Sequence, residues 1–363
     1  MMRIRLALTS VMAAALLAAC GGGGDGNQAP AVQYTQLVSF GDSLSDVGTY
    51  GTDGMKAGAA SAYAGKYTVN GPNAKNWTEL LAAQLRLSAP CPAETGLLSI
   101  SSLSGLAQAV VDHAGCYNYA QGGARVTDAV GPGNLGLLAL TPAETAGALG
   151  QMTVPVVTQI SRHLAAVGGA FSGNELVTVM AGGNDVFRLL ADVSYGRKTT
   201  TEAVTAMGVA GGQLAAYVNT LIVAKGAKRV VVANLVDVSK SPFGYSQSAS
   251  TQAFINVMVA TFNAQLSAGL ASTQGVLLVD AYTASRDQAA NPGQYGLSNA
   301  TTPACNLSAA TNPLASSMMC NDGNVISGDV STYLFADTVH PTPFGYKLLT
   351  QLITGAMAAR GWL

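Results

Sequence analysis

The chain has little charge, and this shortage narrows the classes of partner that it can bind. Only 10% of its 363 residues are charged, and the net charge is −1, whereas ordinary soluble proteins have about 25% charged residues. No cluster of Lys and Arg appears. Nucleic-acid binding needs a concentrated basic face, so we predict no nucleic-acid partner. Small polar residues must cover the surface, and the 49% of hydrophobic residues is enough for a sizeable core.

Cysteine is also scarce, and its spacing does not resemble a zinc-ligand pattern. The five cysteines are Cys20, Cys91, Cys116, Cys305 and Cys320. Without Cys20 four are left, and four cysteines allow three pairings. The simplest pairing is local, Cys91 with Cys116 and Cys305 with Cys320, so that each disulfide closes one long loop. Such bonds are typical of oxidising compartments, including the periplasm.

No apolar run near the N-terminus is long enough to span a membrane, which takes about 20 residues. The stretch from Leu6 to Ala19 follows Arg3 and Arg5 and ends in small residues. This is the pattern of a secretory signal. We therefore predict a signal peptide over 1–19, a flexible tether over 20–35 and one folded domain over 36–363.

Cys20 follows small residues and precedes a glycine run, an arrangement that resembles the lipobox of bacterial lipoproteins. The resemblance implies that Cys20 is lipidated and anchors the exported protein to a membrane. By similarity to enterobacterial lipoproteins, the outer membrane is expected. The alternative is an ordinary cleaved signal and a periplasmic or secreted protein.

Strand and helix patterns alternate along the rest of the chain. We expect strands at 37–40, 176–180, 230–238 and 276–282, a short strand leading into 118–123, and helices at 76–87, 154–167, 200–225, 249–271 and 344–359. The unbroken β-branched run at 230–238 is typical of a strand that is buried on both faces of a parallel sheet. This alternation predicts an α/β fold with a doubly wound sheet. Segments 88–116, 124–150 and 300–330 fit no regular element, and no internal repeat is evident.

Ser43 is the candidate nucleophile. It lies on the turn after the first strand, at Gly41-Asp42-Ser43-Leu44, where open α/β sheets bind their ligands. A serine hydroxyl reacts only when a base takes its proton. The chain has three histidines, and only His340 has a carboxylate, Asp337, three residues away on a short segment bounded by Pro341.

Four short blocks together resemble the GDSL-type esterases of the SGNH hydrolase superfamily. They are Gly41-Asp42-Ser43-Leu44, Asn118-Tyr119-Ala120-Gln121-Gly122-Gly123-Ala124, Gly182-Gly183-Asn184-Asp185 and Asp337-Thr338-Val339-His340. Each block alone occurs by chance, but four in this order are specific. The resemblance implies a three-layer, flavodoxin-like parallel sheet and a serine ester hydrolase that acts through an acyl-enzyme, with no metal and no organic cofactor.

The resemblance also assigns the residues and the partners. Ser43 is the nucleophile, His340 the base and Asp337 the acid. The oxyanion hole consists of the Ser43 and Gly123 N–H groups and the Asn184 amide. The expected substrate is an ester of a lipid, a small acyl group or an acylated polysaccharide. Alternatives are an acyltransferase, a thioesterase or a non-catalytic cell-surface module on the same fold.

Other polar residues receive structural interpretations. Asp42 and Asp46 are expected to accept backbone N–H groups around the nucleophile turn, and Asp185 to cap a helix. His163 is expected at a surface or groove, and His113 has no assigned role. Tyr346 departs from the many relatives that carry histidine at this place, with little effect expected.

The apolar loop after the second block allows two interpretations. Segment 124–150 contains Leu135, Leu137, Leu138 and Leu140. Either these leucines line an acyl-binding groove, or they pack on the domain.

Overall fold

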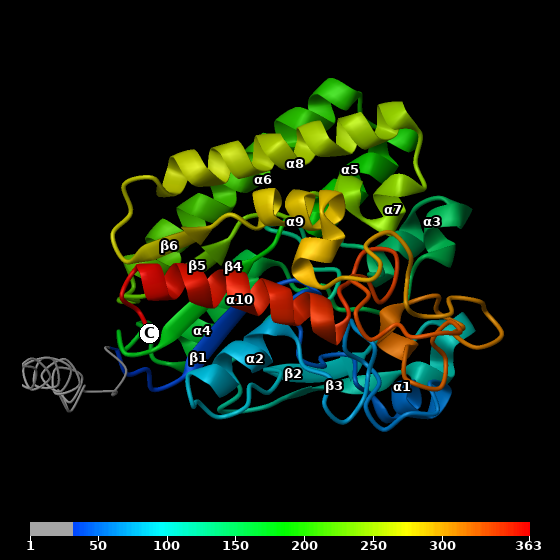
Figure 1. Cartoon of the computed structure of the whole chain (residues 1–363), viewed down its shortest axis with the longest axis horizontal. Helices are drawn as coiled ribbons and strands as arrows, with labels where there is room; N and C mark the ends of the chain where they lie inside the picture. Colours follow the sequence, from blue (N-terminus) through cyan, green and yellow to red (C-terminus); the bar gives the residue numbers. More distant parts are fainter. Residues whose placement is uncertain (1–31) are drawn as a thin grey trace, which may run out of the picture.

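Four parallel strands form the central sheet, in the order β1-β4-β5-β6 (Figure 1). The computed structural model describes residues 32–363. The strands are β1 (Leu37–Gly41), β4 (Leu176–Met180), β5 (Val230–Ala233) and β6 (Val276–Val279). Asn118 adds a parallel bridge to Ser39. When this segment is counted as a minimal strand beside β1, the order is 2-1-3-4-5, that of flavodoxin-like sheets. The predicted fold class is confirmed.

Residues alternate between two buried faces along each strand, because successive strand side chains point to opposite sides. On β5, Val230 and Val232 belong to one core and Val231 and Ala233 to the other. Every residue of β5 is buried. This double burial explains the unbroken apolar run in the sequence.

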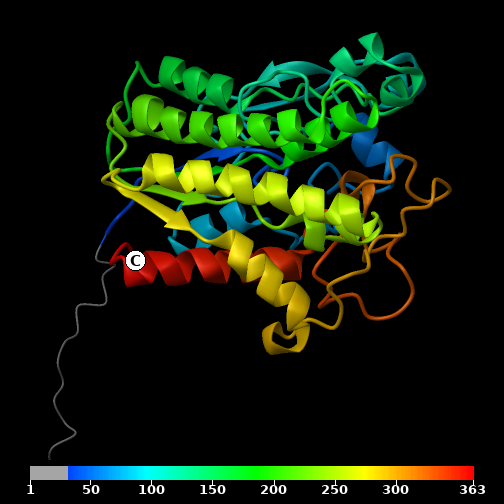
Figure 2. The ribbon, with the colours of Figure 1, turned by 90° about the horizontal axis from the view of Figure 1, so that it is seen from above.

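Helices cover both faces of the sheet. The α-helices are α1 (Asp53–Gly58), α2 (Trp77–Gln84), α3 (Pro142–Ala146), α4 (Val156–Ala166), α5 (Gly183–Ser194), α6 (Thr200–Tyr217), α7 (Pro242–Tyr245), α8 (Ala249–Leu270), α9 (Ala281–Ala290) and α10 (Pro343–Ala359). Shorter helical segments are η1 (Ser101–Leu106), η2 (Leu135–Ala139), η3 (Val218–Val223), η4 (Val238–Lys240), η5 (Pro292–Tyr295) and η6 (Ser317–Met319). The core of α4, α5, α6 and α8 lies on one face and that of α2 and α10 on the other, and Figure 2 shows α6 and α8 across the sheet from α10. These are the three predicted layers.

Two strands were predicted to be longer than they are, because the chain leaves the sheet early. The strand expected at 230–238 ends at Ala233, and the one expected at 276–282 ends at Val279. Asn263 of α8 holds both the N–H and the C=O of Leu235 at 2.8 Å, so side-chain bonds replace a strand partner. Asp280 caps α9 by accepting from the Thr283 N–H. Likewise, two isolated bridges of Asn118, to Ser39 and to Pro92, replace the strand expected before 118–123.

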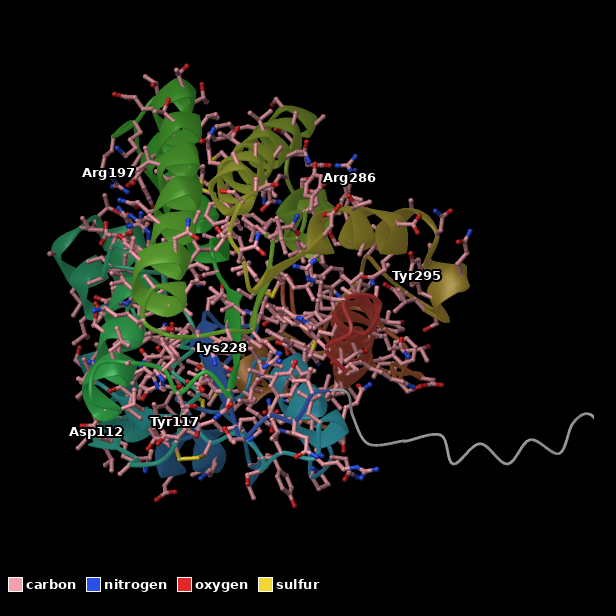
Figure 3. All side chains as sticks on the ribbon, turned by 90° about the vertical axis from the view of Figure 1, so that its left-hand side faces the viewer. Asp112, Tyr117, Arg197, Lys228, Arg286 and Tyr295 are labelled. Carbon is pink, nitrogen blue, oxygen red and sulfur yellow. A yellow bond between two sulfur atoms is a disulfide. The ribbon has the colours of Figure 1, made fainter. Side chains whose placement is uncertain are left out.

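The segment 88–116, expected to be irregular, contains a small antiparallel sheet. Its strands are β2 (Glu94–Leu97) and β3 (Gln108–Asp112). The structure contains disulfides between Cys91 and Cys116 and between Cys305 and Cys320. This is the local pairing among the three that the sequence allowed. The first disulfide lies next to Tyr117 (Figure 3).

The N-terminal predictions fall mostly outside the described residues. The signal peptide over 1–19, Cys20 and the tether up to residue 31 are not described. Two tether residues, Tyr34 and Thr35, already contact the domain. The Tyr34 hydroxyl donates to the carbonyl of Trp362 at 2.9 Å, and the Thr35 N–H donates to the carbonyl of Asn174 at 3.0 Å.

His163 is fully buried, so its predicted place at a surface or groove is wrong. It lies on the buried face of α4 with Val156, Gln159 and Ile160, at the helical spacing that turns one side toward the sheet. Aromatic rings of Phe40, Tyr117, Tyr119 and Phe171 surround it. Neither ring nitrogen has a hydrogen-bond partner within residues 32–363. Burial lowers the pKa of His163 to about 4.

We predict that His163→Phe stabilises the fold, because burying an unpartnered polar group costs about 1–3 kcal/mol. The variant should also lose part of its acid sensitivity. The native histidine takes up a proton only near pH 4, whereas the unfolded chain does so near pH ~6.5. Between these values the unfolded state binds more protons, so the wild-type stability falls as the pH falls.

Urea denaturation at pH 7.5 and pH 5 measures both effects. His113→Gln is the control, since His113 is partly exposed and bonded to Thr95 Oγ1 at 2.8 Å. A His163→Phe variant that is less stable than the wild type and has the same pH dependence would contradict this account.

Candidate active site

A cavity of about 390 Å³ opens at the carboxyl edge of the sheet. All four strands are parallel, so the turns that follow them meet at this edge. Ser43 follows β1 there, and Asn184 follows β4 in the first turn of α5. His340 reaches the same cavity from the loop before α10. Gly123 of the second block also lines the cavity, so the structure brings all four sequence blocks to one place.

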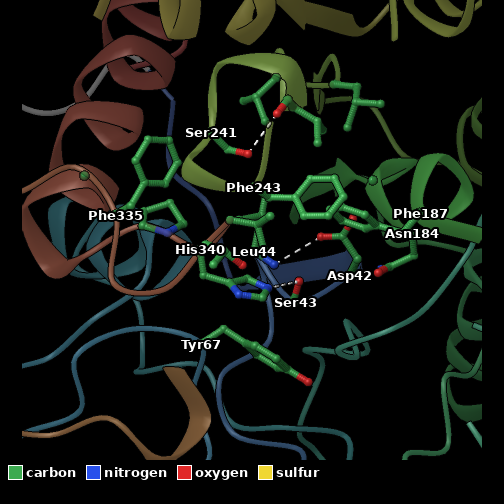
Figure 4. Close-up of a pocket in the computed structure, with 18 of the residues that line it drawn as sticks. Asp42, Ser43, Leu44, Tyr67, Asn184, Phe187, Ser241, Phe243, Phe335 and His340 are labelled. Carbon is green, nitrogen blue, oxygen red and sulfur yellow. Dashed lines mark hydrogen bonds between the residues drawn. The ribbon is translucent and has the colours of Figure 1, made fainter. Parts of the chain in front are cut away.

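Ser43, His340 and Asp337 form one continuous hydrogen-bonded chain. Ser43 Oγ lies 2.8 Å from His340 Nε2 (Figure 4). His340 Nδ1 lies 2.8 Å from Asp337 Oδ2. An ionised carboxylate can only accept, so Nδ1 carries the proton toward Asp337. Nε2 is then free to accept the proton of the Ser43 hydroxyl. This is the geometry that activates a serine.

The Asp337 carboxylate is fully buried yet ionised. Burial favours its neutral form, but the His340 ring and three backbone N–H donors outweigh burial and hold the pKa of Asp337 well below its usual range. Val339 and His340 donate to Oδ1 at 2.9 and 2.8 Å. Ser317 donates to Oδ2 at 2.9 Å. Ser317 lies inside the loop that the Cys305–Cys320 disulfide closes, so this loop helps to orient the acid.

The nucleophile turn is held from α4. Gln159 accepts from the Gly41 N–H and donates to the Gly41 C=O, both at 2.8 Å. Gly41 must be glycine, because a Cβ there would lie 2.2 Å from the carbonyl oxygen of Met180. Asp42 accepts from the Leu44 N–H at 3.1 Å, as expected of a structural carboxylate. Burial raises the pKa of Asp42 to about 7.

Asp46 joins the nucleophile turn to the second block. Oδ1 accepts from the N–H groups of Gly48 and Thr49 at 2.8 and 2.7 Å, and Oδ2 accepts from the Gly122 N–H at 2.9 Å. The expectation that Asp46 binds backbone N–H groups is confirmed, and its reach to Gly122 is new. Burial raises the pKa of Asp46 to about 6. Hydrogen bonds of Asp46 therefore connect the turn that carries Ser43 to the turn that carries Gly123.

Two residues that line the cavity, Ser43 and Gly123, have unpaired backbone N–H groups within the described part of the chain. Within residues 32–363, neither the Ser43 N–H nor the Gly123 N–H has a protein acceptor. Gly123 has φ +80°, and a Cβ there would lie 2.4 Å from the carbonyl oxygen of Pro132, so only glycine fits. Asn184 Nδ2 donates to the carbonyl of Ala124 at 2.8 Å, which fixes the amide. Its second hydrogen is available to a ligand.

Asp185 does not cap α5, contrary to the sequence prediction. Gly182 is the N-cap residue, without a side-chain bond. Asp185 lies within the first turn, where it accepts from Arg125 Nε at 3.0 Å and from the Val126 N–H at 3.1 Å. A carboxylate at the positive end of a helix is favourable. Its contacts tie α5 to the chain that follows Gly123.

The loop 124–150 lines the cavity, but not with its predicted leucines. Pro132, Gly133, Gly147 and Leu149 contribute to the wall. By contrast, Leu137 is buried with Ile100 and Ala148 in a separate cluster, against which Leu135 packs, and Leu138 and Leu140 are exposed. The second interpretation therefore holds for Leu135 and Leu137. An acyl groove built from these four leucines is wrong.

The apolar wall of the cavity comes from other segments. Phe187 of α5 and Phe243 of α7 pack edge to face, with ring centroids 5.2 Å apart. Leu235, Val236 and Val238 line the cavity between β5 and α7. This wall is formed where the chain leaves the sheet after Ala233. An apolar wall with few polar groups is typical of a site for a small organic ligand.

Gln159, Ser317 and Tyr67 contribute to the site without having been predicted from the sequence. Gln159 lies 118 positions from the Gly41 that it holds, and Ser317 lies 20 positions from Asp337. No local pattern marks such residues. Among residues 32–363, no group of three or more His, Cys, Asp and Glu side chains could hold a metal ion.

Comparison with known proteins gives related esterases. The chain is 27% identical to Esterase EstA of Pseudomonas aeruginosa over 380 residues, covering 98% of this chain and 51% of that protein. It is 26% identical over 206 residues to a GDSL esterase/lipase of Arabidopsis thaliana, covering 52% of this chain and 54% of that protein. The chain spans about half the length of the curated relatives that it matches.

A member of the lipolytic protein G-D-S-L family from Veillonella parvula has a solved structure that covers 89% of this chain and 98% of its own. It is 16% identical with a TM-score of 0.41. The family profile of the GDSL-like Lipase/Acylhydrolase, in contrast, matches residues 37–353, which include every element from β1 to most of α10. The chain belongs to the GDSL-like lipase/acylhydrolase family.

Proposed function

We propose that the protein is a carboxylic ester hydrolase that uses Ser43 as its nucleophile. One observation carries this proposal: Ser43 and His340 of the Ser43–His340–Asp337 chain line the same cavity as the two residues with unpaired N–H groups, Ser43 and Gly123. The first supplies an activated hydroxyl, and the second supplies donors for negative charge on a carbonyl oxygen. Acyl transfer needs both at one place.

The reaction follows from these positions. His340 Nε2 takes the Ser43 proton while Oγ attacks the ester carbonyl, and Asp337 stabilises the imidazolium that forms. The N–H groups of Ser43 and Gly123 and the Asn184 amide bind the oxyanion. His340 then donates its proton to the departing alcohol, which leaves an acyl group on Ser43. Water attacks that ester by the same steps and releases the acid.

The apolar wall suggests that the acyl group is a hydrocarbon chain longer than acetyl. Phe187, Leu235 and Phe243 would contact such a chain. Each buried methylene contributes about 0.8 kcal/mol, so a chain that fills the wall binds better than acetate. Substrates with this chemistry include lipid esters and small acyl esters.

Removal of the nucleophile tests the proposal. Ser43→Ala should lower kcat by at least about 10⁴-fold on p-nitrophenyl butyrate, and Asp337→Asn by about 10⁴-fold, because the imidazole loses its tautomer. Asn184→Ala should cost about 10²–10³-fold, as removal of one oxyanion donor does. The control is Ser241→Ala, a serine of the same cavity whose hydroxyl donates to the carbonyl of Val238.

A folded wild type that hydrolyses no ester from acetate to palmitate would sink the proposal and favour a non-catalytic module. Added alcohol separates a hydrolase from an acyltransferase, because a transferase forms the new ester in place of the free acid. A thioester series covers the thioesterase alternative.

A substitution in the apolar wall should change the acyl-chain preference. Val236 is partly buried and lines the cavity, so Val236→Phe should occupy space meant for the chain. We expect kcat/KM for hexanoate to fall by about tenfold or more, since three lost methylene contacts are worth about 2.4 kcal/mol. The rate on acetate should stay within about threefold.

Leu138→Phe is the matched control, because Leu138 is 48% exposed and does not line the cavity. Measurement of kcat/KM over the p-nitrophenyl series gives both profiles. Equal loss on acetate and hexanoate in Val236→Phe would place the acyl chain elsewhere.

We further propose that the protein is exported and lipidated at Cys20. The signal-like stretch over 1–19 and the lipobox-like Cys20 support this, and two disulfides suit an oxidising compartment. The expected partner is then a membrane, reached through the lipid.

Expression in a bacterium that processes lipoproteins tests export. Mass spectrometry should find a mature chain that begins at a lipid-modified Cys20 and sediments with the membranes, while Cys20→Ser should be unmodified and released from them. An unprocessed, soluble chain that starts at Met1 and has reduced cysteines would contradict export.

A further inference from the structure

We propose that Tyr67 is a positioning residue that acts through His340: its aromatic face supports the imidazole and stabilises the imidazolium formed during the reaction. The ring centroids of Tyr67 and His340 lie 4.6 Å apart with an angle of 40° between the planes. Figure 4 shows Tyr67 against His340 in the cavity. The effect of Tyr67 on catalysis rests on the proposed function, whereas its effect on the proton affinity of His340 does not.

The Tyr67 contact completes the environment of the imidazole. Asp337 binds Nδ1 and Ser43 binds Nε2, and both bonds lie at the edge of the ring. These two hydrogen bonds hold Nδ1 and Nε2, but they leave the imidazole ring free to rotate about the axis through the two nitrogens. A ring against its face opposes this motion. The negative face of an aromatic ring also attracts a cation within about 6 Å of its centroid.

Tyr67 is itself held at several points. Its hydroxyl accepts from Gln151 Nε2 at 2.7 Å, and its backbone carbonyl accepts from the Tyr346 hydroxyl at 3.1 Å. The ring packs edge to face against Tyr50, with centroids 6.5 Å apart. Gly122 leaves room for the hydroxyl, because a Cβ there would lie 1.8 Å from it. A ring fixed in this way can hold its neighbour.

Tyr346 thereby acquires a role. From the sequence, little effect of this tyrosine was expected. In the structure its hydroxyl reaches 279 positions along the chain to the carbonyl of Tyr67. It is therefore part of the support for the residue that contacts the base.

Packing alone is the competing explanation, since Tyr67 also belongs to a buried cluster with Tyr50, Met55 and Met318. The two explanations differ in electrostatics. If the Tyr67 ring only packs, a reduction of its π charge leaves the proton affinity of His340 unchanged. If the Tyr67 ring stabilises the imidazolium, the same reduction lowers that proton affinity.

The ionisable groups around His340 must be counted in any pH experiment. Asp337 lies on its own loop, Asp42 at the end of β1 carries a charge that acts on His340, and Tyr346 comes from α10. Asp237 and Lys240 also line the cavity, and Asp237 pairs with Arg286 at 2.6 Å. Burial raises the pKa of Asp42 to about 7 and that of Asp46 to about 6, so each variant is also compared in the Asp42→Asn and Asp46→Asn backgrounds.

The experiment is an NMR titration of the His340 ring in the full chain, assigned by the loss of its signal in His340→Gln. Phenylalanines with zero, one, two and three fluorine atoms are incorporated at position 67, because fluorine depletes the face of the ring at nearly constant shape. We expect Tyr67→Phe to keep the titration midpoint. The fluorinated series should lower it stepwise, and Tyr67→Leu should lower it by about 0.4–0.7 pH unit.

Activity supplies the second readout. Above the acid limb of the pH profile, kcat/KM should fall by about two- to fivefold in Tyr67→Leu and stay near wild type in Tyr67→Phe. The control is Tyr50→Phe, because Tyr50 lies in the same buried cluster without contacting His340. In this variant the titration midpoint of His340 should be unchanged, even if the rate of hydrolysis changes.

A midpoint that stays fixed across the folded fluorinated series would overturn the proposal, even if the rates fall. The titration needs no substrate, so the outcomes are separable. A midpoint that moves in a protein without esterase activity would sustain the Tyr67 contact and defeat the proposed function.

Discussion

The buried carboxylate of Asp337 is the constraint on which the site depends. A charge placed in a protein interior is costly unless donors surround it, and three backbone N–H groups and the His340 ring do so. These donors come from two separate loops. The carboxylate thus fixes the loop of His340 against the disulfide-closed loop of Ser317. Because it stays ionised, it also decides which nitrogen of His340 faces Ser43.

The nucleophile turn and the apolar wall are also held by buried polar side chains that bind backbone groups. Gln159 satisfies both backbone groups of Gly41, and Asp46 joins the nucleophile turn to Gly122. Asn263 does the same for Leu235 where β5 ends. In each case a side chain replaces a backbone partner at the place where the chain leaves regular structure. Buried backbone groups need such partners, and here these partners also set the positions of the reactive turns and of the apolar wall.

A substantial part of this arrangement could be predicted from the amino-acid sequence. The unbroken apolar runs are set by burial on both sides of β5, so they identified the parallel sheet directly. Ser43 and Asn184 lie in short blocks directly after strands, and Gly123, Asp337 and His340 lie in short blocks on loops; all four blocks reach one cavity as expected. The strand ends and the loop leucines were predicted less well. Asn263 ends β5 from a distant helix, and whether Leu137 faces a cavity or a separate core depends on Ile100 and Ala148.

The sequence by itself therefore determined the fold class and the candidate nucleophile, base and acid, because periodicity and short motifs are local properties. It left three disulfide pairings open, and the structure contains the local one. Only the tertiary structure decided which groups surround them. Tyr67 against His340, Gln159 on Gly41 and Ser317 on Asp337 are contacts between residues that are not neighbours in the sequence. The burial of His163 was likewise decided by the side of α4 that packs on β1. Contacts across the fold depend on how elements pack, and packing leaves no pattern in the neighbouring residues.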